Sequence, residues 1–479
     1  MKRVRTRFAP SPTGFMHIGN LRTALYCYLF AKQNNGDFIL RIEDTDLERT
    51  VEGAVDVIYN TLKESKMEIS EGPLQGGNYG PYVQTERKDL YLKYALELVE
   101  KGAAYYCFCD KERLDSLTSE SGIKRYDKHC LHLSKEEVQE RLARGDSWVI
   151  RQNMPTEGFS EFDDLVFGHV RIPNNELEDQ ILIKSDGLPT YNFANVVDDH
   201  LMEISHVMRG NEYLSSTPKY NLLYDAFGWE HPEYVHLTPI MKDAQRKLSK
   251  RHGDANFDDF TRKGYLPEAI INYIALLGWS PKGEEEKFTM EELIEKFSID
   301  GLSKSSSIFD EDKMHWLNGE YIKELSFDKF MEYATPFFEA SPIKGLYDYE
   351  KFGKLLQSRI CIFSEIAEKV EFITKFEKID PEMYFHKKLK IDSEVAKVVL
   401  EKTLPEIERV ENWCEDSLHA VILKAAEELE KKSGVVYTVL RIAISSCTVT
   451  PGGITELADI LGKEESVKRL RQALAWLNN

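Results

Sequence analysis

The stretch VRTRFAPSPTGFMHIGNLRTALYCYLFAKQNNGDFILRIED, residues 4–44, determines the fold class that we expect. Its first six residues are β-like, and PSPTGFMHIGN at 10–20 is a loop punctuated by Gly and Pro. Apolar residues then recur at helical spacing until Asn34, Asn35 and Gly36 stop them, and DFILRIED follows as a second strand. This order predicts a βαβ unit in a parallel sheet, and therefore an α/β fold.

The character of the sequence changes three times after this unit. Residues 101–190 contain cysteines, a charged helix at 134–144 and the strand candidates SWVIRQ and DQILIK, which together indicate an inserted α+β domain. A strand-and-loop pattern then resumes from LPTYNFANVVDDH to KLSKR, with VHLTPIM as a strand that completes the sheet. After about residue 260 nearly every segment has helical period, although the β-branched run in VVYTVLRIAIS leaves a strand as an alternative.

The overall composition excludes several classes of protein. A chain of 479 residues exceeds what one hydrophobic core supports, so we expect two to four domains. The net charge of -19 argues against indiscriminate binding to nucleic acid or membrane, so a polyanion must bind on a local basic patch. We find no export signal and no apolar run of the roughly 20 residues that span a membrane, and seven cysteines in such a chain favour reduced thiols. A soluble, cytosolic protein is expected.

The tetrapeptide HIGN at 17–20 lies where a loop meets the amino terminus of a helix. Free backbone N–H groups and the helix dipole favour a phosphate there, and Gly14 and Gly19 lack the Cβ that would obstruct a nucleotide. An isolated His-x-Gly is also a common capping or packing feature. HIGN by itself therefore leaves the function open.

A second motif, KLSKR at 247–251, lies in a loop with four cations within six residues. A run of cations this dense is usually only a solvated part of the protein surface. This loop, however, follows a strand, and the carboxyl ends of strands in α/β folds are where ligands bind. Its lysines could therefore hold a departing pyrophosphate.

Together, PSPTGFMHIGNLRTAL and KLSKR resemble the HIGH and KMSKS signatures of class I aminoacyl-tRNA synthetases, with Asn20 replacing the last His and Leu248 replacing Met. RIEDTD at 41–46, GLPTYNFANVVDDH at 187–200 and FDEDKMHWLNGEYI at 309–322 narrow the resemblance to glutamyl-tRNA synthetases of bacterial type, over essentially the whole chain. The resemblance implies ATP-dependent activation of L-glutamate to glutamyl-adenylate, followed by transfer to the 3′ end of tRNA(Glu). AMP and pyrophosphate are released.

The resemblance also implies a domain order. It consists of a Rossmann-like catalytic domain from 1–100 and 191–260, an inserted tRNA acceptor-binding domain at 101–190, a helical stem-contact domain at 261–325, and a helical anticodon-binding region at 326–479.

The same resemblance assigns residues to the reaction, which needs positioning and charge stabilisation more than covalent catalysis. The catalytic residues it implies are His17, Lys247 and Lys250. The residues implied to bind ATP, with its Mg²⁺, are His17, Gly19, Glu212, Lys247, Ser249 and Lys250. Those implied to bind glutamate are Arg7, Ser11, Glu43, Tyr191, Asn195 and Arg209.

The residues implied to bind glutamate suit this substrate, which has two carboxylates and an ammonium group. The two guanidinium groups suit the carboxylates, and Glu43 suits the ammonium. Which arginine binds which carboxylate stays open. A neutral glutamine would leave a buried guanidinium unpaired, at a cost of about 2–5 kcal/mol, so no editing domain is needed. Without the family, Arg7 could face solvent from an edge strand, Glu43 could pair with Arg41, and Tyr191 could belong to the core.

A metal site is expected in the insertion. Cys107, Cys109, Cys130 and His132 form a Cys-x-Cys…Cys-x-His pattern that suits tetrahedral zinc, although buried free cysteines are also common. RYDKHCLH resembles the zinc-binding segment of some family members, which implies structural Zn²⁺. The other cysteines, Cys27, Cys361, Cys414 and Cys447, are expected in the core.

Recognition of RNA is harder to locate in the sequence. The region from about 326 onward would bind the anticodon, with Arg359, Lys468, Arg469 and Arg471 as candidate contacts, although basic residues on helices are usually solvated. Whether tRNA(Gln) is charged as well stays open, and the family suggests a monomer. A glutaminyl-tRNA synthetase would carry a β-barrel in place of the helical region. A non-catalytic paralogue would tend to lose HIGN, KLSKR and the pocket arginines.

Overall fold

The computed structural model describes residues 3–117, 125–248 and 255–478. It divides into two compact units, Met1–Phe260 with Ile270–Asp310, and Thr261–Ala269 with Glu311–Asn479. The second unit holds most of the region that the sequence predicts to be helical. The finer division into four domains stays a prediction.

The predicted βαβ unit is confirmed. Strand β1 (Arg5–Phe8), helix α1 (Ile18–Gln33) and strand β2 (Asp37–Leu40) follow one another, and β1 and β2 run parallel. The turn into β2 needs glycine because a Cβ on Gly36 would overlap the carbonyl oxygen of Val4. The loop between β1 and α1 therefore starts at the carboxyl end of a parallel strand.

The second half of the sheet lies beside β1. The backbone N–H of Ser205 donates to the carbonyl of Arg5 over 3.0 Å, which places β8 (His206–Gly210) next to β1. β8 pairs in parallel with β9 (Glu233–Leu237), and β9 pairs in parallel with β5 (Phe159–Asp164). β5 forms a hairpin with β6 (Gly168–Pro173). The predicted strand in VHLTPIM is confirmed as part of β9 and as β10 (Ile240–Met241).

One prediction in this half is wrong. The stretch TYNFANVVDDH, expected within a strand-and-loop pattern, forms helix α6 (Tyr191–Leu201). Its apolar residues Phe193 and Val197 are spaced by one helical turn and are fully buried against α3 (Lys88–Glu100) and α7 (Thr217–Phe227). The helix brings Asp198 and Asp199 into the interior of the first unit.

The insertion has the expected α+β composition. Strands β3 (Ala104–Cys107), β4 (Val149–Gln152) and β7 (Ile181–Ile183) form an antiparallel sheet that contains both strand candidates. The charged helix is α5 (Lys135–Arg144), which begins at a capping box between Ser134 and Glu137.

The other elements of the first unit are α2 (Ala54–Glu64), η1 (Gln84–Arg87), α4 (Lys111–Ser116), η2 (His129–His132), η3 (Asn174–Glu176), η4 (Asn211–Ser216), α10 (Met290–Lys296), η6 (Ile299–Gly301) and β11 (Ser307–Ile308). Helices α8 (Phe257–Lys263) and α9 (Pro267–Leu276) have residues in both units.

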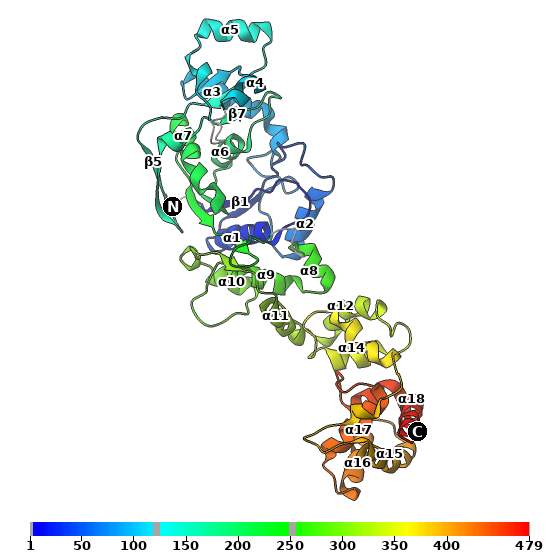
Figure 1. Cartoon of the computed structure of the whole chain (residues 1–479). Helices are drawn as coiled ribbons and strands as arrows, with labels where there is room; N and C mark the ends of the chain where they lie inside the picture. The colour runs from blue at the N-terminus through cyan, green and yellow to red at the C-terminus, as the bar shows by residue number, and fades with distance from the viewer. Residues whose placement is uncertain (1–2, 118–124, 249–254, 479) are drawn as a thin grey trace. The chain divides into compact units, whose positions relative to one another are not determined.

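The second unit is helical, as predicted (Figure 1). VVYTVLRIAIS forms helix α17 (Ser433–Ser445), so the strand alternative is wrong there. Its valines, leucine and isoleucines are buried in one apolar core, which favours a helix despite their β-branching. The other elements are α11 (Glu311–Glu324), α12 (Phe327–Glu339), α13 (Tyr349–Leu356), α14 (Glu365–Thr374), η7 (Pro381–Tyr384), α15 (Ser393–Glu408), α16 (Glu415–Glu428) and α18 (Ile454–Leu477).

The basic residues proposed for RNA contact have different environments. Arg469 on α18 is only 3% exposed, and its guanidinium donates to the carbonyls of Ile444 and Ile373. Its assignment as an RNA contact is therefore wrong. Arg359 and Arg471 are exposed and pair with Glu456 and Glu408.

All seven cysteines are free thiols, of which Cys27 is buried as expected. Cys361, Cys414 and Cys447 are only partly buried, so their expected core positions are wrong. Across the residues that the structure describes, no helix has the length and apolar character that crossing a membrane requires.

Candidate active site

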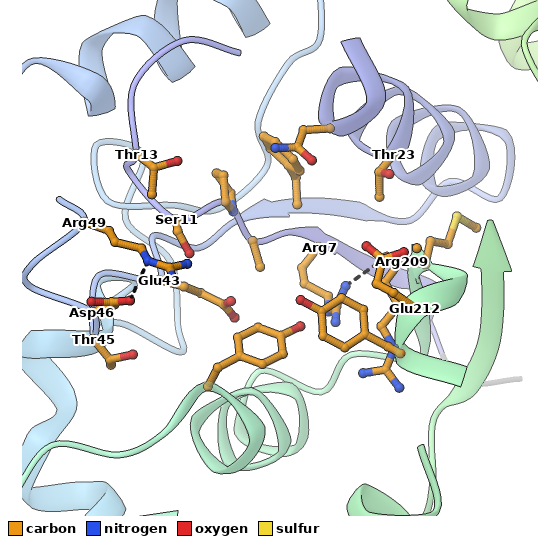
Figure 2. A pocket seen from close by; sticks show the side chains of 18 residues that line it. Arg7, Ser11, Thr13, Thr23, Glu43, Thr45, Asp46, Arg49, Arg209 and Glu212 are labelled. Carbon is orange, nitrogen blue, oxygen red and sulfur yellow. Dashed lines mark hydrogen bonds and ion pairs between the residues drawn. The ribbon is translucent and has the colours of Figure 1, made fainter. Parts of the chain in front are cut away.

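An open pocket of about 470 Å³ lies at the carboxyl ends of β1 and β8. Figure 2 shows its walls, which come from the loop after β1, the first turn of α6 and η4. Six of the predicted residues line it: Arg7, Ser11, Glu43, Tyr191, Arg209 and Glu212. This position matches the place where open α/β sheets bind ligands.

Arg7 is buried, so the alternative that it faces solvent is wrong. Its Nε and Nη2 donate to the two carboxylate oxygens of Asp199 over 3.0 and 3.2 Å, and its Nη1 donates to the carbonyl of Met208. Burial raises the pKa of Asp199, but the charges of Arg7 and Arg41 outweigh it and hold that pKa below its ordinary value. The carboxylate therefore stays ionised and holds Arg7 in place.

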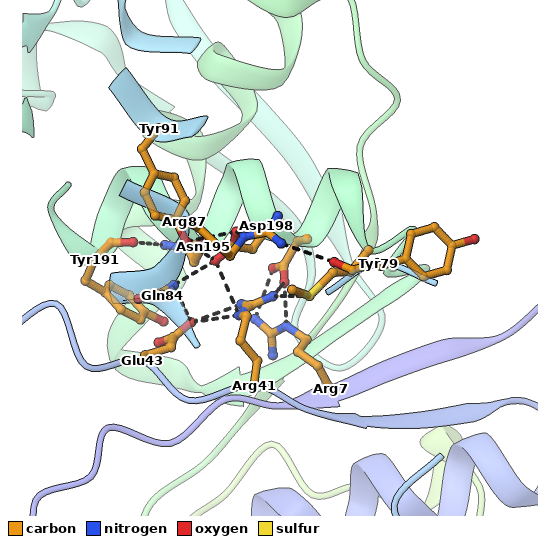
Figure 3. Close-up of polar contacts among 12 residues, drawn as sticks. Arg7, Arg41, Glu43, Tyr79, Gln84, Arg87, Tyr91, Tyr191, Asn195 and Asp198 are labelled. Carbon is orange, nitrogen blue, oxygen red and sulfur yellow. Dashed lines mark hydrogen bonds and ion pairs between the residues drawn. The ribbon is translucent and has the colours of Figure 1, made fainter. Parts of the chain in front are cut away.

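Glu43 both pairs with Arg41 and lines the pocket, so the two interpretations of this residue hold together. Arg41 donates to Glu43 Oε1 over 3.0 Å and to Asp199 Oδ1 over 2.8 Å, and its side chain is fully buried (Figure 3). Burial raises the pKa of Glu43 to about 7, although Arg41 and Arg7 oppose this shift. This carboxyl group changes its charge near neutral pH.

Asp198, the neighbour of Asp199 on α6, belongs to the same buried polar network, because its Oδ2 lies 3.7 Å from Arg41 Nε (Figure 3). It accepts hydrogen bonds from Arg87 Nε over 2.7 Å, Tyr91 Oη over 2.8 Å and Gln84 Nε2 over 2.9 Å. Consecutive helical residues point about 100° apart, so Asp198 also binds Arg87 and Asp199 also binds Arg7. Arg41 pairs with both aspartates. Sequence reasoning did not find this pair, since two acids in DDH look like any solvated helix end.

Arg209 reaches the pocket from the end of β8. Its Nη2 donates to Thr217 Oγ1 over 2.7 Å, and its guanidinium lies 4.6 Å from the ring centre of Tyr220. Its Nη1 has no hydrogen-bond partner among the described residues. Arg209 is thus held on two sides while it keeps a donor for a ligand.

Backbone contacts join HIGN to the segment that begins at Ala255, four residues after KLSKR. The N–H of Ile18 donates to the carbonyl of Ala255 over 2.9 Å, and the N–H of Phe257 donates to the carbonyl of Met16. His17 is the N-cap of α1 and its Nδ1 accepts the N–H of Gly19 over 3.0 Å. The segment after KLSKR therefore lies against HIGN, and the capping role expected of an isolated His-x-Gly is present too.

The KLSKR loop folds back on the strand before it, because the N–H of Leu248 donates to the carbonyl of Ile240. Lys247 is exposed at this turn. Ser249 and Lys250 lie outside the described residues. Glu212 curls over Gly210, where any Cβ would overlap its carboxylate.

Among the residues predicted to bind glutamate, only Asn195 does not line the pocket. It is 2% exposed, and its Nδ2 donates to the carbonyl of Tyr191 one turn earlier on α6. This contact supports the first turn of the helix, where Tyr191 enters the pocket.

The cysteines of the insertion form a cluster apart from the pocket. The sulfur atoms of Cys107, Cys109 and Cys130 lie within 4.8 Å of one another. His132 is exposed and lies outside this group. The hydroxyl of Tyr126 lies 3.3 Å from Cys107 Sγ and 3.6 Å from Cys109 Sγ instead. Three thiols and an oxygen donor form a set that fits zinc.

Comparisons with known proteins agree with this geometry. Residues 3–316 match the family model described as tRNA synthetases class I (E and Q), catalytic domain, and residues 329–474 match an anticodon binding domain. The chain is 58% identical to a glutamate–tRNA ligase of Clostridium novyi (strain NT), over 99% of this chain and 98% of that protein. It is 57% identical to a glutamate–tRNA ligase of Clostridium botulinum (strain Hall), over 98% and 97%.

A solved structure is similar along its whole length. A glutamate tRNA ligase from Elizabethkingia meningosepticum, crystallised in complex with its amino acid, superposes with a TM-score of 0.90 at 34% identity. The match covers 99% of each chain.

Proposed function

This chain belongs to the class I glutamyl-tRNA synthetases, and on that premise we propose how its pocket performs the reaction. It is a glutamate–tRNA ligase, which activates L-glutamate with ATP and transfers it to tRNA. The carboxylate oxygen of glutamate attacks the α-phosphorus of ATP and pyrophosphate leaves. A ribose hydroxyl at the end of the tRNA then attacks the acyl carbon, and AMP leaves.

Glutamate is bound by the residues that converge on the pocket. The open Nη1 of Arg209 donates to a carboxylate of the substrate, and Arg7, held by Asp199, adds positive potential beside it. Tyr191 and Ser11 supply hydroxyl groups, and Glu43 accepts the ammonium once it is ionised. Asn195 contributes by supporting Tyr191.

ATP binding is assigned to HIGN and the KLSKR motif. His17 and the first N–H groups of α1 bind phosphate, and Gly19 leaves room for it. Lys247 and Lys250 neutralise the departing pyrophosphate, and Ser249 contributes a hydroxyl to ATP binding. Glu212 helps to place ATP at the edge of the pocket. Mg²⁺ bound with ATP would offset part of the charge of its phosphates.

Cys107, Cys109 and Cys130 would hold zinc in the insertion. Tyr126 is the nearer fourth donor, because its hydroxyl already contacts two of the sulfurs, whereas the sequence pattern favours His132. Metal analysis of Tyr126→Phe and His132→Ala decides between them, since the true ligand variant loses zinc to a chelator first. The site is structural, and it would hold the insertion that contacts the tRNA acceptor end.

The substrates and partners follow from this assignment. We assign tRNA(Glu) as the substrate RNA and the helical region as its anticodon site, a monomer as the functional form and the cytoplasm as the location. Aminoacylation of purified tRNA(Glu) and tRNA(Gln) determines whether the second tRNA is charged as well.

The observation that carries the proposal is the convergence of Arg7, Glu43, Tyr191 and Arg209 on one pocket. ATP–pyrophosphate exchange tests it, with glutamate, glutamine or no amino acid, each with and without tRNA. Exchange should require glutamate and tRNA together. An absence of glutamate-dependent exchange under every condition would contradict the proposal.

A further inference from the structure

Arg209 makes one contact that the pocket itself does not explain. Its Nε donates to Nε2 of His236 over 3.1 Å, and Nδ1 of the same ring lies 2.7 Å from Asp164 Oδ2. The side chains of His236 and Asp164 are both fully buried. The three residues come from β8, β9 and β5, so the chain of contacts runs across three neighbouring strands towards the pocket.

We infer that His236 is a positioning residue, whose neutral imidazole, oriented by Asp164, holds Arg209 for glutamate. The inference rests on the proposed role of Arg209 in glutamate binding. It assigns a role in substrate recognition to two residues that do not line the pocket.

The directions of the hydrogen bonds establish the protonation of the ring. The Nε of an arginine always carries a hydrogen, so Nε2 of His236 must accept from it. Nδ1 faces a carboxylate and therefore carries the single ring hydrogen. Thr217 Oγ1, 3.3 Å from Nε2, donates its hydrogen to the carbonyl of Tyr213 and accepts from Arg209 Nη2. A second ring proton would point at the guanidinium.

The surroundings keep the ring neutral. Burial lowers the pKa of His236, the charge of Arg209 lowers it further, and Asp164 and Glu212 only partly oppose these effects. Asp164 is itself well anchored, because its oxygens also accept the backbone N–H groups of Val166, Phe167 and His236. Near neutral pH, Nε2 of His236 is therefore unprotonated and held in position to accept from Arg209.

The geometry has a consequence for Arg209. His236 accepts from Nε and Thr217 accepts from Nη2, while Tyr220 lies over the guanidinium, so Nη1 is the nitrogen that has no hydrogen bond to another described residue. A guanidinium ordered before glutamate arrives loses less entropy on binding. Loss of the acceptor at His236 should therefore weaken glutamate binding and leave ATP binding unchanged.

Two substitutions distinguish the hydrogen-bond acceptor at His236 from the space that its side chain fills. In His236→Gln the side-chain amide oxygen can lie near the position of Nε2 and accept from Arg209. In His236→Asn the shorter amide can still donate to Asp164, but it cannot reach Arg209. The variants are compared in aminoacylation with saturating tRNA, and thermal unfolding is recorded for each.

His236→Asn should raise the KM for glutamate about tenfold to a hundredfold, as expected for a lost hydrogen bond to a charged group, with the KM for ATP within about twofold. His236→Gln should recover most of the affinity. In an Arg209→Lys background His236→Asn should add little, because the two effects share one path. Equal KM values for the Gln and Asn variants, or full additivity with Arg209→Lys, would overturn the inference.

A spectroscopic measurement covers the case in which the Asn variant does not fold. Nitrogen NMR of histidine-labelled enzyme should show the His236 ring neutral at pH 7, protonated on Nδ1 only, with the signal assigned from its absence in His236→Gln. A doubly protonated ring contradicts the inference. If wild-type enzyme fails to use glutamate at all, the proposed function fails instead, so the two failures are distinguishable.

Discussion

Buried arginines serve opposite purposes in the two units of the chain. Arg209 in the first unit is held by two neutral acceptors and keeps Nη1 for a ligand. Arg469 in the second unit is equally buried, but its three nitrogens are used by Glu465 and by the carbonyls of Ile444 and Ile373. The first arginine should matter to catalysis and the second to stability, because all three guanidinium nitrogens of Arg469 are already bonded within the protein.

The largest effect is expected from Arg209→Met. The substrate carboxylate would lose its open donor in a buried site, so kcat/KM for glutamate should fall about a thousandfold. The free energy of unfolding should fall by only about 1 kcal/mol, because one buried acceptor, Nε2 of His236, loses its donor. Aminoacylation kinetics and thermal unfolding measure the two quantities. Equal losses in kcat/KM for glutamate and in stability would remove the distinction between the units.

Arg469→Met should produce the reverse pattern. It leaves two buried carbonyls without their donor, so the free energy of unfolding should fall by about 3 kcal/mol. Glutamate-dependent exchange should stay within about twofold of wild type, because Arg469 contacts none of the residues that line the pocket. Denaturant unfolding followed by circular dichroism measures the loss.

The matched control for this experiment is Arg471→Met on the same helix. Arg471 is exposed and pairs with Glu408, so its removal should change the free energy of unfolding by less than about 0.5 kcal/mol. A comparable loss in both variants would show that burial of Arg469 is not the cause.

Lys247→Ala extends the comparison to an exposed cation. Adenylate formation should slow about a hundredfold, because pyrophosphate would leave without its counter-charge. Glutamate binding and the melting temperature should stay near wild type. Single-turnover exchange and equilibrium binding separate the two steps, and an equal loss in both would contradict the role given to Lys247.

The smallest effect concerns the buried acid of the pocket. The pKa of Glu43 is raised to about 7, so the group gains its charge as the pH rises through 7. Because the ionised form accepts the ammonium of glutamate, the KM for glutamate should fall with rising pH, by at most about tenfold per pH unit below 7. The titration of Glu43 has the opposite effect on the free energy of unfolding. Because its pKa is higher in the folded protein than in the unfolded chain, stability declines as the pH rises towards 7. Glu43→Gln should flatten the KM profile, and an unchanged profile would exclude Glu43 as its source.

The sequence alone determined the βαβ unit, the helical second unit and the family, because these depend on local periodicity and on motifs within a few residues. It also identified six of the residues that line the pocket, because the short motifs around Arg7, Glu43, Tyr191 and Arg209 are contiguous. Local rules failed at 191–201, where burial against α3 and α7 selects a helix, and at Arg469, whose basic pattern resembles a solvated face.

Only the tertiary structure decided which groups work together. Asp199 pairs with Arg7, Asp164 orients His236, and Tyr126 approaches the cysteines in place of His132. The first two pairs join segments 192 and 72 residues apart, so no spacing rule could link them. The physical reason is that a buried charge takes its partner from whatever packing brings within hydrogen-bonding distance, and packing is a property of the whole first unit.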